Sequence, residues 1–263
     1  MRIATWNINS VRLRIEQVKK FADENQPDII CLQETKVRDD LFPLADIKSL
    51  GYENVVFRGE KSYNGVAILS KNKIEVKDKL NIAGAQDARH ISVVLPGGIE
   101  LHNFYIPAGG DEPDVAINPK YKFKLEFVDY MSSWFNKNRK PSDKIIILGD
   151  FNIAPLENDV WSHKQLQNVV SHTEPEITRL NSLQKGLGWV DSGRHFVPAN
   201  EKLYSWWSYR NSDWKQSNRG RRLDHIWVTP ALKNSLKSHK VVSATRDWER
   251  PSDHVPVVVD FNK

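Results

Sequence analysis

The sequence predicts an α/β fold in which two mixed, mostly antiparallel β-sheets pack face to face with helices on the outside. Short apolar segments with the pattern of β-strands alternate with a few amphipathic segments of helical period. Each half of the chain opens with a strand that ends in asparagine, at Asn7 and at Asn152, which indicates two β-rich lobes. Because no low-complexity tract or Pro/Gly-rich linker divides the 263 residues, we expect one domain over residues 1–263.

The first half of the chain contains two predicted helices among its strands. The strands are expected at residues 3–7, 29–32, 66–69, 91–95 and 101–106. The turn sequence Pro96-Gly97-Gly98 separates the last two and predicts a hairpin. A helix over residues 11–22 would place its apolar side chains on one face and end before Pro27. A second amphipathic helix carries Phe123, Phe127, Tyr130 and Trp134.

The second half repeats this alternation. A continuous apolar strand over residues 144–148 leads into Gly149-Asp150-Phe151-Asn152. A third helix carries Leu180, Leu183 and Leu187 on one face, and Gly188 is expected to end it. Further strands are expected at residues 223–228, 240–244 and 255–261.

Composition restricts the class of protein. Hydrophobic residues make up 40% of the chain and charged residues 27%, which is ordinary for a water-soluble globular protein. No apolar run approaches the length of a membrane span, and the N-terminus lacks signal-peptide architecture, so we expect a cytoplasmic protein without membrane partners, nucleoid-associated if it acts on DNA. Cys31 is the only cysteine, which excludes an internal disulfide and a cysteine-based zinc site.

The charge balance is mildly basic. Lys and Arg number 38 against 33 Asp and Glu, for a net charge of +5, which is compatible with a polyanionic partner. The basic cluster Arg219-Gly220-Arg221-Arg222 follows an aromatic run from Tyr204 to Arg210. Aromatic faces beside guanidinium groups suit bases and phosphates. A surface ion cluster beside core aromatics explains the same residues equally well.

Polar residues gather at the ends of the predicted strands. Five lie at or just after the end of a strand and three at the start of one: Asn7, Glu34, Tyr105, Asp150, Asn152, Asp224, Asp253 and His254. In antiparallel neighbours the end of one strand lies beside the start of the next. All eight are therefore expected at one edge of the sandwich.

Such a cluster has a definite chemistry. Carboxylate and amide oxygens are hard ligands that suit Mg²⁺ or Mn²⁺ better than zinc. A metal so bound can lower the pKa of a water and neutralise charge on a phosphoryl oxygen. His254 can supply a positive charge or a proton, and a carboxylate on its other ring nitrogen would orient it and raise its pKa. Taken singly, each residue also has a structural explanation; Asn7 and Asn152, for example, are common turn formers.

The features occur together along the whole chain, in six motifs: Trp6-Asn7-Ile8-Asn9, Leu32-Gln33-Glu34-Thr35-Lys36, Tyr63-Asn64-Gly65-Val66-Ala67, Gly149-Asp150-Phe151-Asn152-Ile153-Ala154-Pro155, Arg222-Leu223-Asp224-His225-Ile226 and Pro251-Ser252-Asp253-His254-Val255-Pro256-Val257. Together they strongly resemble the exonuclease III family of DNA repair enzymes, which cleave DNA at abasic sites. The likeness extends from residue 1 to about residue 261.

The resemblance implies a four-layered α/β sandwich and a role for each residue of the cluster. Glu34 would bind the metal, Mg²⁺ or alternatively Mn²⁺, with Asn7 nearby and Asp253 as a further or water-mediated ligand. Asp150 would activate the attacking water or protonate the leaving group, and Asn152 would hold Asp150 and the phosphate; these two are also candidates for a second metal site. His254, oriented by Asp224, would contact the scissile phosphate, and Tyr105 would donate to the phosphate or the leaving oxygen.

The resemblance also implies the substrate and its contacts. Duplex DNA with abasic sites or 3′ ends would be bound by a monomer, through Arg12, Lys36, Trp206, Arg219 and Arg221. Trp206 would line the pocket that receives a sugar without a base. Three positions depart from the family pattern: Ala108 stands where relatives often carry Asn or Gln, Asp111 where some carry Arg, and Arg221 where Leu or Trp is frequent. These changes affect the balance of abasic-site incision and 3′ trimming.

We therefore predict a magnesium-dependent DNA repair hydrolase with abasic-site endonuclease and 3′ phosphodiesterase or exonuclease activity. One alternative is another branch of the same superfamily that acts on inositol phosphates or sphingomyelin. Another is a nucleic-acid-binding module without catalysis, although such a protein would not need Glu34, Asp150, Asp224 and His254 together.

Overall fold

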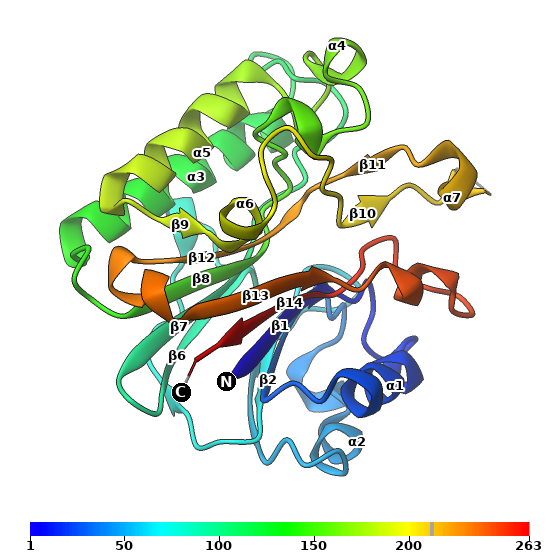
Figure 1. Cartoon of the computed structure of the whole chain (residues 1–263), viewed down its shortest axis with the longest axis vertical. Helices are drawn as coiled ribbons and strands as arrows, with labels where there is room; N and C mark the ends of the chain where they lie inside the picture. Colours follow the sequence, from blue (N-terminus) through cyan, green and yellow to red (C-terminus); the bar gives the residue numbers. More distant parts are fainter. Residues whose placement is uncertain (211–212, 263) are drawn as a thin grey trace.

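Two six-stranded sheets face each other at the centre of the protein (Figure 1). The computed structural model describes residues 1–210 and 213–262. The first sheet has the order β13 (Leu236–Val241), β14 (Val257–Phe261), β1 (Arg2–Asn7), β2 (Ile29–Gln33), β4 (Val66–Ser70), β3 (Asn54–Arg58). The second has the order β5 (Glu75–Val76), β6 (His90–Leu95), β7 (Ile99–Tyr105), β8 (Ile145–Asp150), β12 (Asp224–Val228), β9 (Val190–Asp191). A separate ribbon pairs β10 (Trp206–Trp207) with β11 (Gly220–Arg221).

The pairing in the two large sheets is mixed and mostly antiparallel. The pairs β1–β2 and β7–β8 are parallel, and the remaining pairs are antiparallel. The predicted hairpin is present, with Leu95 opposite Ile99. Because β1 and β2 end at one edge of the first sheet, and β7 and β8 at one edge of the second, four strand ends lie close together.

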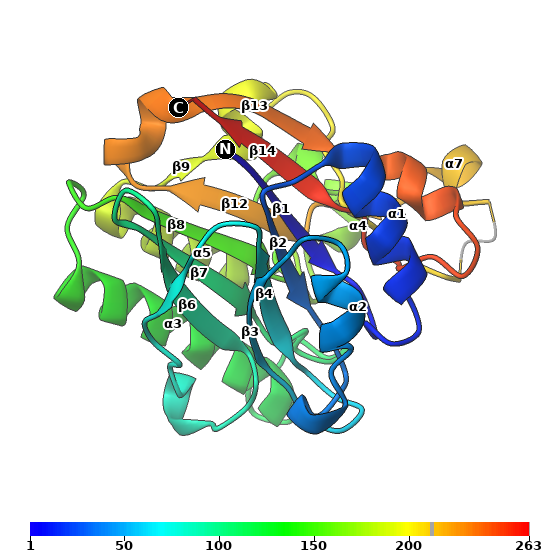
Figure 2. The same cartoon turned by 90° about the horizontal axis from the view of Figure 1, so that it is seen from below.

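Helices cover the outer face of each sheet, which completes the four layers (Figure 2). The first sheet is covered by α1 (Ile15–Asn25) and α2 (Leu44–Lys48), and the second by α3 (Pro119–Asn138) and α5 (Glu174–Leu187). The shorter helices are α4 (His163–Leu166), α6 (Ser192–Phe196) and α7 (Trp214–Ser217). A capping box between Thr173 and Glu176 starts α5, and Gly188, at φ 67°, ends it as predicted.

Three apolar cores hold these layers together. The core between the sheets contains Ile68, Leu101 and Leu148, all without solvent exposure. A second core joins α1 to the first sheet, and a third joins α3 and α5 to the second. Cys31 lies on β2 in the core between the sheets, and burial raises the pKa of its thiol far above the usual range.

Two predicted boundaries were wrong. The first helix starts at Ile15, because residues 8–11 instead form a loop whose Val11 N–H bonds to the carbonyl of Thr35. The strand expected at 240–244 is β13, Leu236–Val241, and Ser243–Asp247 is a 3₁₀ helix. Sequence patterns also missed β3, whose residues are all half-buried, and the two-residue β5.

Among the described residues, no helix combines the length and the apolar character that crossing a bilayer requires.

The core between the sheets should control global stability. Leu148→Ala removes a fully buried side chain from β8 and should lower the free energy of unfolding by about 2–5 kcal/mol, through lost burial and the cavity left behind. Urea denaturation should show a lower midpoint with an unchanged slope. Val76→Ala, at a side chain 56% exposed on β5, is the control and should change stability by less than about 0.5 kcal/mol.

Candidate active site

The eight strand-end residues lie at one edge of the two sheets, and the Asn7 side chain lies among them. Asn7 Nδ2 lies 2.8 Å from Glu34 Oε1, 2.8 Å from Asp150 Oδ2 and 3.4 Å from His254 Nε2. Asn7 ends β1 in the first sheet, whereas Asp150 ends β8 in the second. A single amide therefore joins the two sheets at the site.

Glu34 directly follows β2, in a left-handed backbone conformation at φ 50°. Its carboxylate accepts a hydrogen bond from Tyr105 OH at 2.9 Å and pairs with Lys36 Nζ at 2.6 Å. Burial would raise the pKa of Glu34, but the charge of Lys36 and the hydrogen bonds from Asn7 and Lys36 lower it below the usual value. Burial and the nearby carboxylates raise the pKa of Tyr105, so its phenol keeps its proton. Glu34 is thus an anion beside a hydroxyl donor.

Asp150 ends β8, and Asn152 lies in the loop that follows it. At Gly149, φ is 135°, and a Cβ there would lie 1.9 Å from the carbonyl oxygen of Phe104, so only glycine fits. Asn152, at φ 52°, donates its backbone N–H to Asp150 Oδ1 at 2.9 Å and its side-chain amide to Asp150 Oδ2 at 3.1 Å. Burial is the main cause of the raised pKa of Asp150, which therefore titrates nearer neutrality than an ordinary aspartate.

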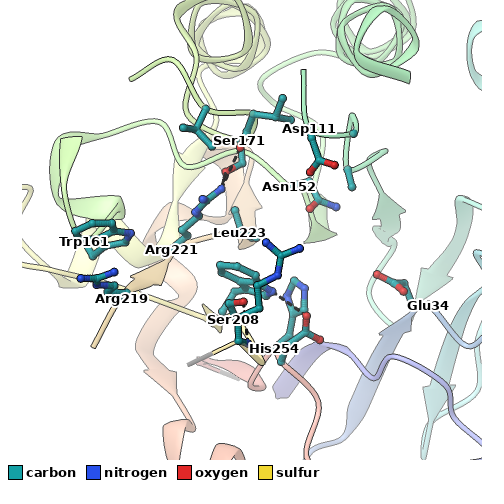
Figure 3. A pocket seen from close by; sticks show the side chains of 17 residues that line it. Glu34, Asp111, Asn152, Trp161, Ser171, Ser208, Arg219, Arg221, Leu223 and His254 are labelled. Atoms are coloured by element: carbon teal, nitrogen blue, oxygen red, sulfur yellow. Dashed lines mark hydrogen bonds between the residues drawn. The ribbon is translucent and has the colours of Figure 1, made fainter. Parts of the chain in front are cut away.

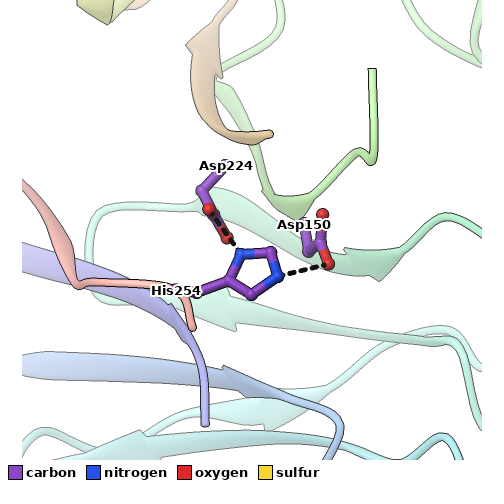
Figure 4. A group of neighbouring side chains, drawn as sticks. All are labelled: Asp150, Asp224 and His254. Carbon is purple, nitrogen blue, oxygen red and sulfur yellow. Dashed lines mark hydrogen bonds and ion pairs between the residues drawn. The ribbon is translucent and has the colours of Figure 1, made fainter. Parts of the chain in front are cut away.

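His254 lies between two carboxylates (Figure 4). Its Nδ1 is 2.8 Å from Asp224 Oδ2, and its Nε2 is 3.6 Å from Asp150 Oδ2. Burial alone would lower the pKa of His254, but the charges of Asp224 and Asp150 outweigh burial and raise it, so the imidazole is protonated at neutral pH. Asp224 Oδ2 also accepts from Ser205 Oγ at 2.6 Å, which fixes the carboxylate. The predicted contact between Asp224 and His254 is present.

The site offers hard oxygen ligands that fit a divalent cation. Glu34 faces the pocket with an anionic carboxylate and already pairs with the ammonium of Lys36. Asp253 also lines the pocket, where it accepts from Trp206 Nε1 at 2.9 Å and from Asn9 Nδ2 at 3.1 Å. Ligand atoms of Asp150, Asp224 and His254 also lie within 4.8 Å of one another. Because a protonated imidazole cannot coordinate a cation, the side of the site around Glu34 suits a metal better.

A pocket opens beside this cluster (Figure 3). Trp206 lines it, whereas Trp207 is buried against Tyr204 and Trp214, so Trp206 is the tryptophan of this pair that faces the site. The remaining lining residues are Glu34, Ala108, Gly110, Asp111, Asn152, Trp161, Val169, Val170, Ser171, Ser208, Arg210, Arg219, Arg221, Leu223, Asp253 and His254.

The basic cluster divides into different environments. The Arg219 guanidinium lies over the Trp161 ring at 4.7 Å and is exposed. Arg221 lies over Trp206 at 5.4 Å and donates to the carbonyl oxygen of Val170 and to Ser171 Oγ. Both line the pocket. Arg222 is buried in ion pairs with Asp159 and Asp191, so it does not contact a phosphate.

The other two expected DNA contacts lie outside the pocket lining. Arg12 is exposed in the loop before α1, and Lys36 pairs with Glu34 and donates to Asn9 Oδ1 at 2.6 Å.

Sequence reasoning missed several residues of the site. Ser205 and Ser252 anchor Asp224 and the backbone of Asn7, and both stand inside motifs that drew notice for other residues. Lys124 and Glu176 lie behind the pocket on two amphipathic helices. A charged residue on a helix usually faces solvent, so no pattern distinguished Lys124, whereas the spacing of Thr173 and Glu176 is a capping-box signal that could have marked Glu176.

Residues 4–254 match the Endonuclease/Exonuclease/phosphatase family. The chain belongs to this family. It is 30% identical over 271 residues to an exodeoxyribonuclease III of Haemophilus influenzae, with 99% of this chain and 100% of the relative covered. An AP endonuclease structure from Archaeoglobus fulgidus superposes with a TM-score of 0.93 at 35% identity, over all of both chains. A 3′ phosphatase from Neisseria bound to a product DNA hairpin superposes with a TM-score of 0.91 at 33% identity, over all of both chains.

These likenesses agree with the exonuclease III resemblance of the motifs and with the four-layered sandwich. The relatives named here are DNA repair nucleases of the Endonuclease/Exonuclease/phosphatase family. This chain is likewise a phosphodiester-hydrolysing enzyme of DNA repair. The resemblance, the fold class and the class of enzyme predicted from the sequence are confirmed.

The contact between Asp224 and His254 can be tested by a double-mutant cycle. His254→Ala removes a preorganised cationic donor and should lower the turnover rate at saturating DNA by about 10²–10³-fold. Asp224→Asn should cost less, because the imidazole remains but is poorly held. Since residues that act as a unit are not additive, the double variant should be little worse than His254→Ala. Losses that multiply would mean that the two residues work independently.

Proposed function

We propose that this enzyme cleaves the phosphodiester backbone 5′ to abasic sites in duplex DNA and removes nucleotides or blocking groups from 3′ ends. The observation that carries the proposal is the row of Asp224, His254 and Asp150 beside Glu34, at the floor of a pocket with Trp206 in its wall. This arrangement combines an ionised imidazole, a carboxylate of raised pKa and an anionic ligand within reach of one phosphate. The names of the relatives support DNA as the substrate.

The chain's own residues divide the work on the scissile phosphate. Protonated His254, held by Asp224, donates to a phosphate oxygen whose negative charge grows during attack. Tyr105 donates its hydroxyl hydrogen to the phosphate or the leaving oxygen. Asp150, whose raised pKa lets it exchange a proton near neutrality, takes a proton from the attacking water or gives one to the leaving oxygen. Asn152 keeps Asp150 oriented through its two hydrogen bonds.

We infer that the metal is Mg²⁺, held directly by Glu34 with Asn7 nearby and with Asp253 as a further or water-mediated ligand. Magnesium keeps several waters, so one or two carboxylates suffice. When bound, the metal neutralises charge on a phosphoryl oxygen and lowers the pKa of a coordinated water. Asn7 Nδ2 faces Glu34 and Asp150, so Asn7 orients these carboxylates through its amide nitrogen.

The pocket supports an extrahelical sugar as the group next to the scissile phosphate. Trp206 gives an apolar wall, and Arg221 and Arg219 supply positive charge. The proposed DNA contacts beyond the pocket are Arg12 and Lys36. We expect the enzyme to act as a monomer with a single catalytic domain. Ala108, Asp111 and Arg221 give this pocket its own composition, and they bear on the balance of incision and 3′ trimming.

Metal dependence is tested with Glu34→Ala. This change removes the direct anionic ligand and should abolish most cleavage of a duplex that carries one abasic-site analogue at ordinary Mg²⁺ concentration. Thermal unfolding should be nearly unchanged, because Glu34 stands in a loop. Treatment of the wild-type enzyme with EDTA should have the same effect, and cleavage that survives EDTA would exclude the proposed metal.

The sugar pocket is tested with Trp206→Ala. Extrusion costs least where the base is already missing, and the loss of the apolar wall should impair incision at the abasic analogue more than binding to undamaged duplex. Incision kinetics and fluorescence anisotropy give the two quantities. Equal losses in both would make Trp206 a general DNA contact.

The two alternative functions predict different results in these measurements. A relative acting on inositol phosphates or sphingomyelin would bind duplex DNA without the steep salt dependence that phosphate contacts cause, whereas Arg221→Ala in a DNA enzyme should reduce the salt slope by about 1 for each lost contact. A binding module without catalysis would bind the abasic duplex and leave it intact.

A further inference from the structure

A charged pair lies fully buried behind the wall of the active-site pocket. Lys124 on α3 and Glu176 on α5 have no solvent exposure, and Lys124 Nζ lies 2.5 Å from Glu176 Oε1. Neither residue lines the pocket, and the roles assigned so far to the catalytic cluster do not involve them. Burial lowers the pKa of Lys124, and the charge of Glu176 opposes this shift.

The Lys124 ammonium has three hydrogen-bond partners, which is the number of its protons. Besides Glu176, it donates to the carbonyl oxygen of Asn152 at 2.7 Å and to that of Ala108 at 3.1 Å. Asn152 and Ala108 both line the pocket but belong to different loops, one after β8 and one after β7. One side chain thus fixes two separate parts of the wall.

Glu176 fixes a third part. Its carboxylate accepts hydrogen bonds from the backbone N–H groups of Ser171 and Thr173 and from the Thr173 hydroxyl. The same segment presents the carbonyl oxygen of Val170 and the Ser171 hydroxyl to Arg221. The position of the Arg221 guanidinium over Trp206 therefore depends on a segment that Glu176 holds.

We propose that Lys124, through its ion pair with Glu176, is a positioning residue that holds the loops of Asn152, Ala108 and Ser171 in the geometry needed for cleavage. Lys124 acts through Asn152 on Asp150 and touches no substrate. Asn152 is left-handed at φ 52°, a conformation disfavoured for most residues, and the bond from Lys124 to its carbonyl oxygen fixes that peptide. Its amide then reaches Asp150.

A contribution to folding stability alone does not explain why Lys124 and Glu176 are buried as a charged pair. Desolvation of two charges offsets most of their attraction, and apolar residues of similar volume often serve stability as well or better. Apolar side chains cannot donate to the carbonyl oxygens of Asn152 and Ala108, so geometry is what the ammonium adds. A role as a nucleophile is excluded, because the amine has no exposure and its three protons are all engaged.

The test separates stability from catalysis with Lys124→Met and Lys124→Met/Glu176→Gln. The single variant leaves a buried carboxylate without its cation, so its Tm should fall; the double variant removes both charges and should regain part of that loss. In both, single-turnover cleavage of the abasic-analogue duplex at saturating enzyme should be at least about tenfold slower, because small displacements of positioned groups are costly. DNA affinity should fall by much less than the cleavage rate, since neither residue meets DNA and Glu176 acts on Arg221 only through the segment that holds it.

Arg139→Met is the matched control. Arg139 pairs with the buried carboxylate of Glu100 at the start of β7, the end of the strand opposite to Tyr105. Its removal should lower Tm without slowing single-turnover cleavage. If Arg139→Met slows cleavage as much as Lys124→Met, or if the double variant cleaves at the wild-type rate, Lys124 is structural and the proposal is overturned.

The role of Lys124 rests on the proposed reaction. An assay of the wild-type enzyme distinguishes failure of the reaction from failure of that role. A wild-type protein that leaves the abasic duplex intact would refute the reaction itself, whereas an active wild-type with an equally active double variant would refute only the role of Lys124. A crystal structure of the double variant gives a readout without activity: the Asn152 amide should no longer lie within hydrogen-bond distance of Asp150. An unchanged Asn152 would also overturn the proposal.

Discussion

The cationic imidazole of His254 is the interaction on which the rest of the site depends. Asp224 and Asp150 contact it from two sides, and Glu34 and Asp253 lie close by. So many carboxylates at one buried edge would repel one another and take up protons if no positive charge lay among them. The charge of Lys36, more than that of His254, keeps Glu34 ionised, whereas burial raises the pKa of Asp150 in spite of His254, so neighbouring acids of similar intrinsic strength can do different work.

The sheets provide the frame for this charge arrangement. The parallel pairs β1–β2 and β7–β8 deliver Asn7, Glu34, Tyr105 and Asp150 to one edge, and antiparallel β12 brings Asp224 opposite Asp150. A second buried charged group, the pair of Lys124 and Glu176, lies behind this edge. There, loops rather than strands form the wall of the pocket. Asn7, Tyr105, Asp150 and Asp224 thus lie on strands, and Glu34, Asn152 and His254 lie in segments next to strands, whereas the pocket beside them depends on side-chain hydrogen bonds between loops.

Much of the fold and of the active site could be predicted from the sequence. Strand ends were readable because apolar runs stop at polar residues. The gathering of Asn7, Glu34, Asp150 and His254 was predicted from antiparallel pairing, whereas β1–β2 and β7–β8 bring their ends together as parallel pairs. The family resemblance placed Trp206 at the pocket, and the packing of Trp207 against Tyr204 and Trp214 shows why Trp207 is the buried neighbour. The first helix was drawn too long, because Val11 fits the helical period although its backbone bonds to Thr35.

The residues that escaped prediction are those whose partners are remote in sequence. Lys124 meets Glu176 across two helices, and Arg222 finds Asp159 and Asp191 far along the chain, so no local pattern marks Lys124 or Arg222 as buried.

The burial of Cys31 has a practical consequence for measuring motion. The only thiol of the chain lies between the two sheets, without solvent exposure and with a raised pKa, so it is shielded from alkylating reagents and spin labels while the protein is folded. A cysteine introduced at an exposed position such as Arg12 would be the single reactive attachment point, with no need to remove the native one. Fluorescence or electron paramagnetic resonance on such a protein would follow the loop before α1 as DNA arrives.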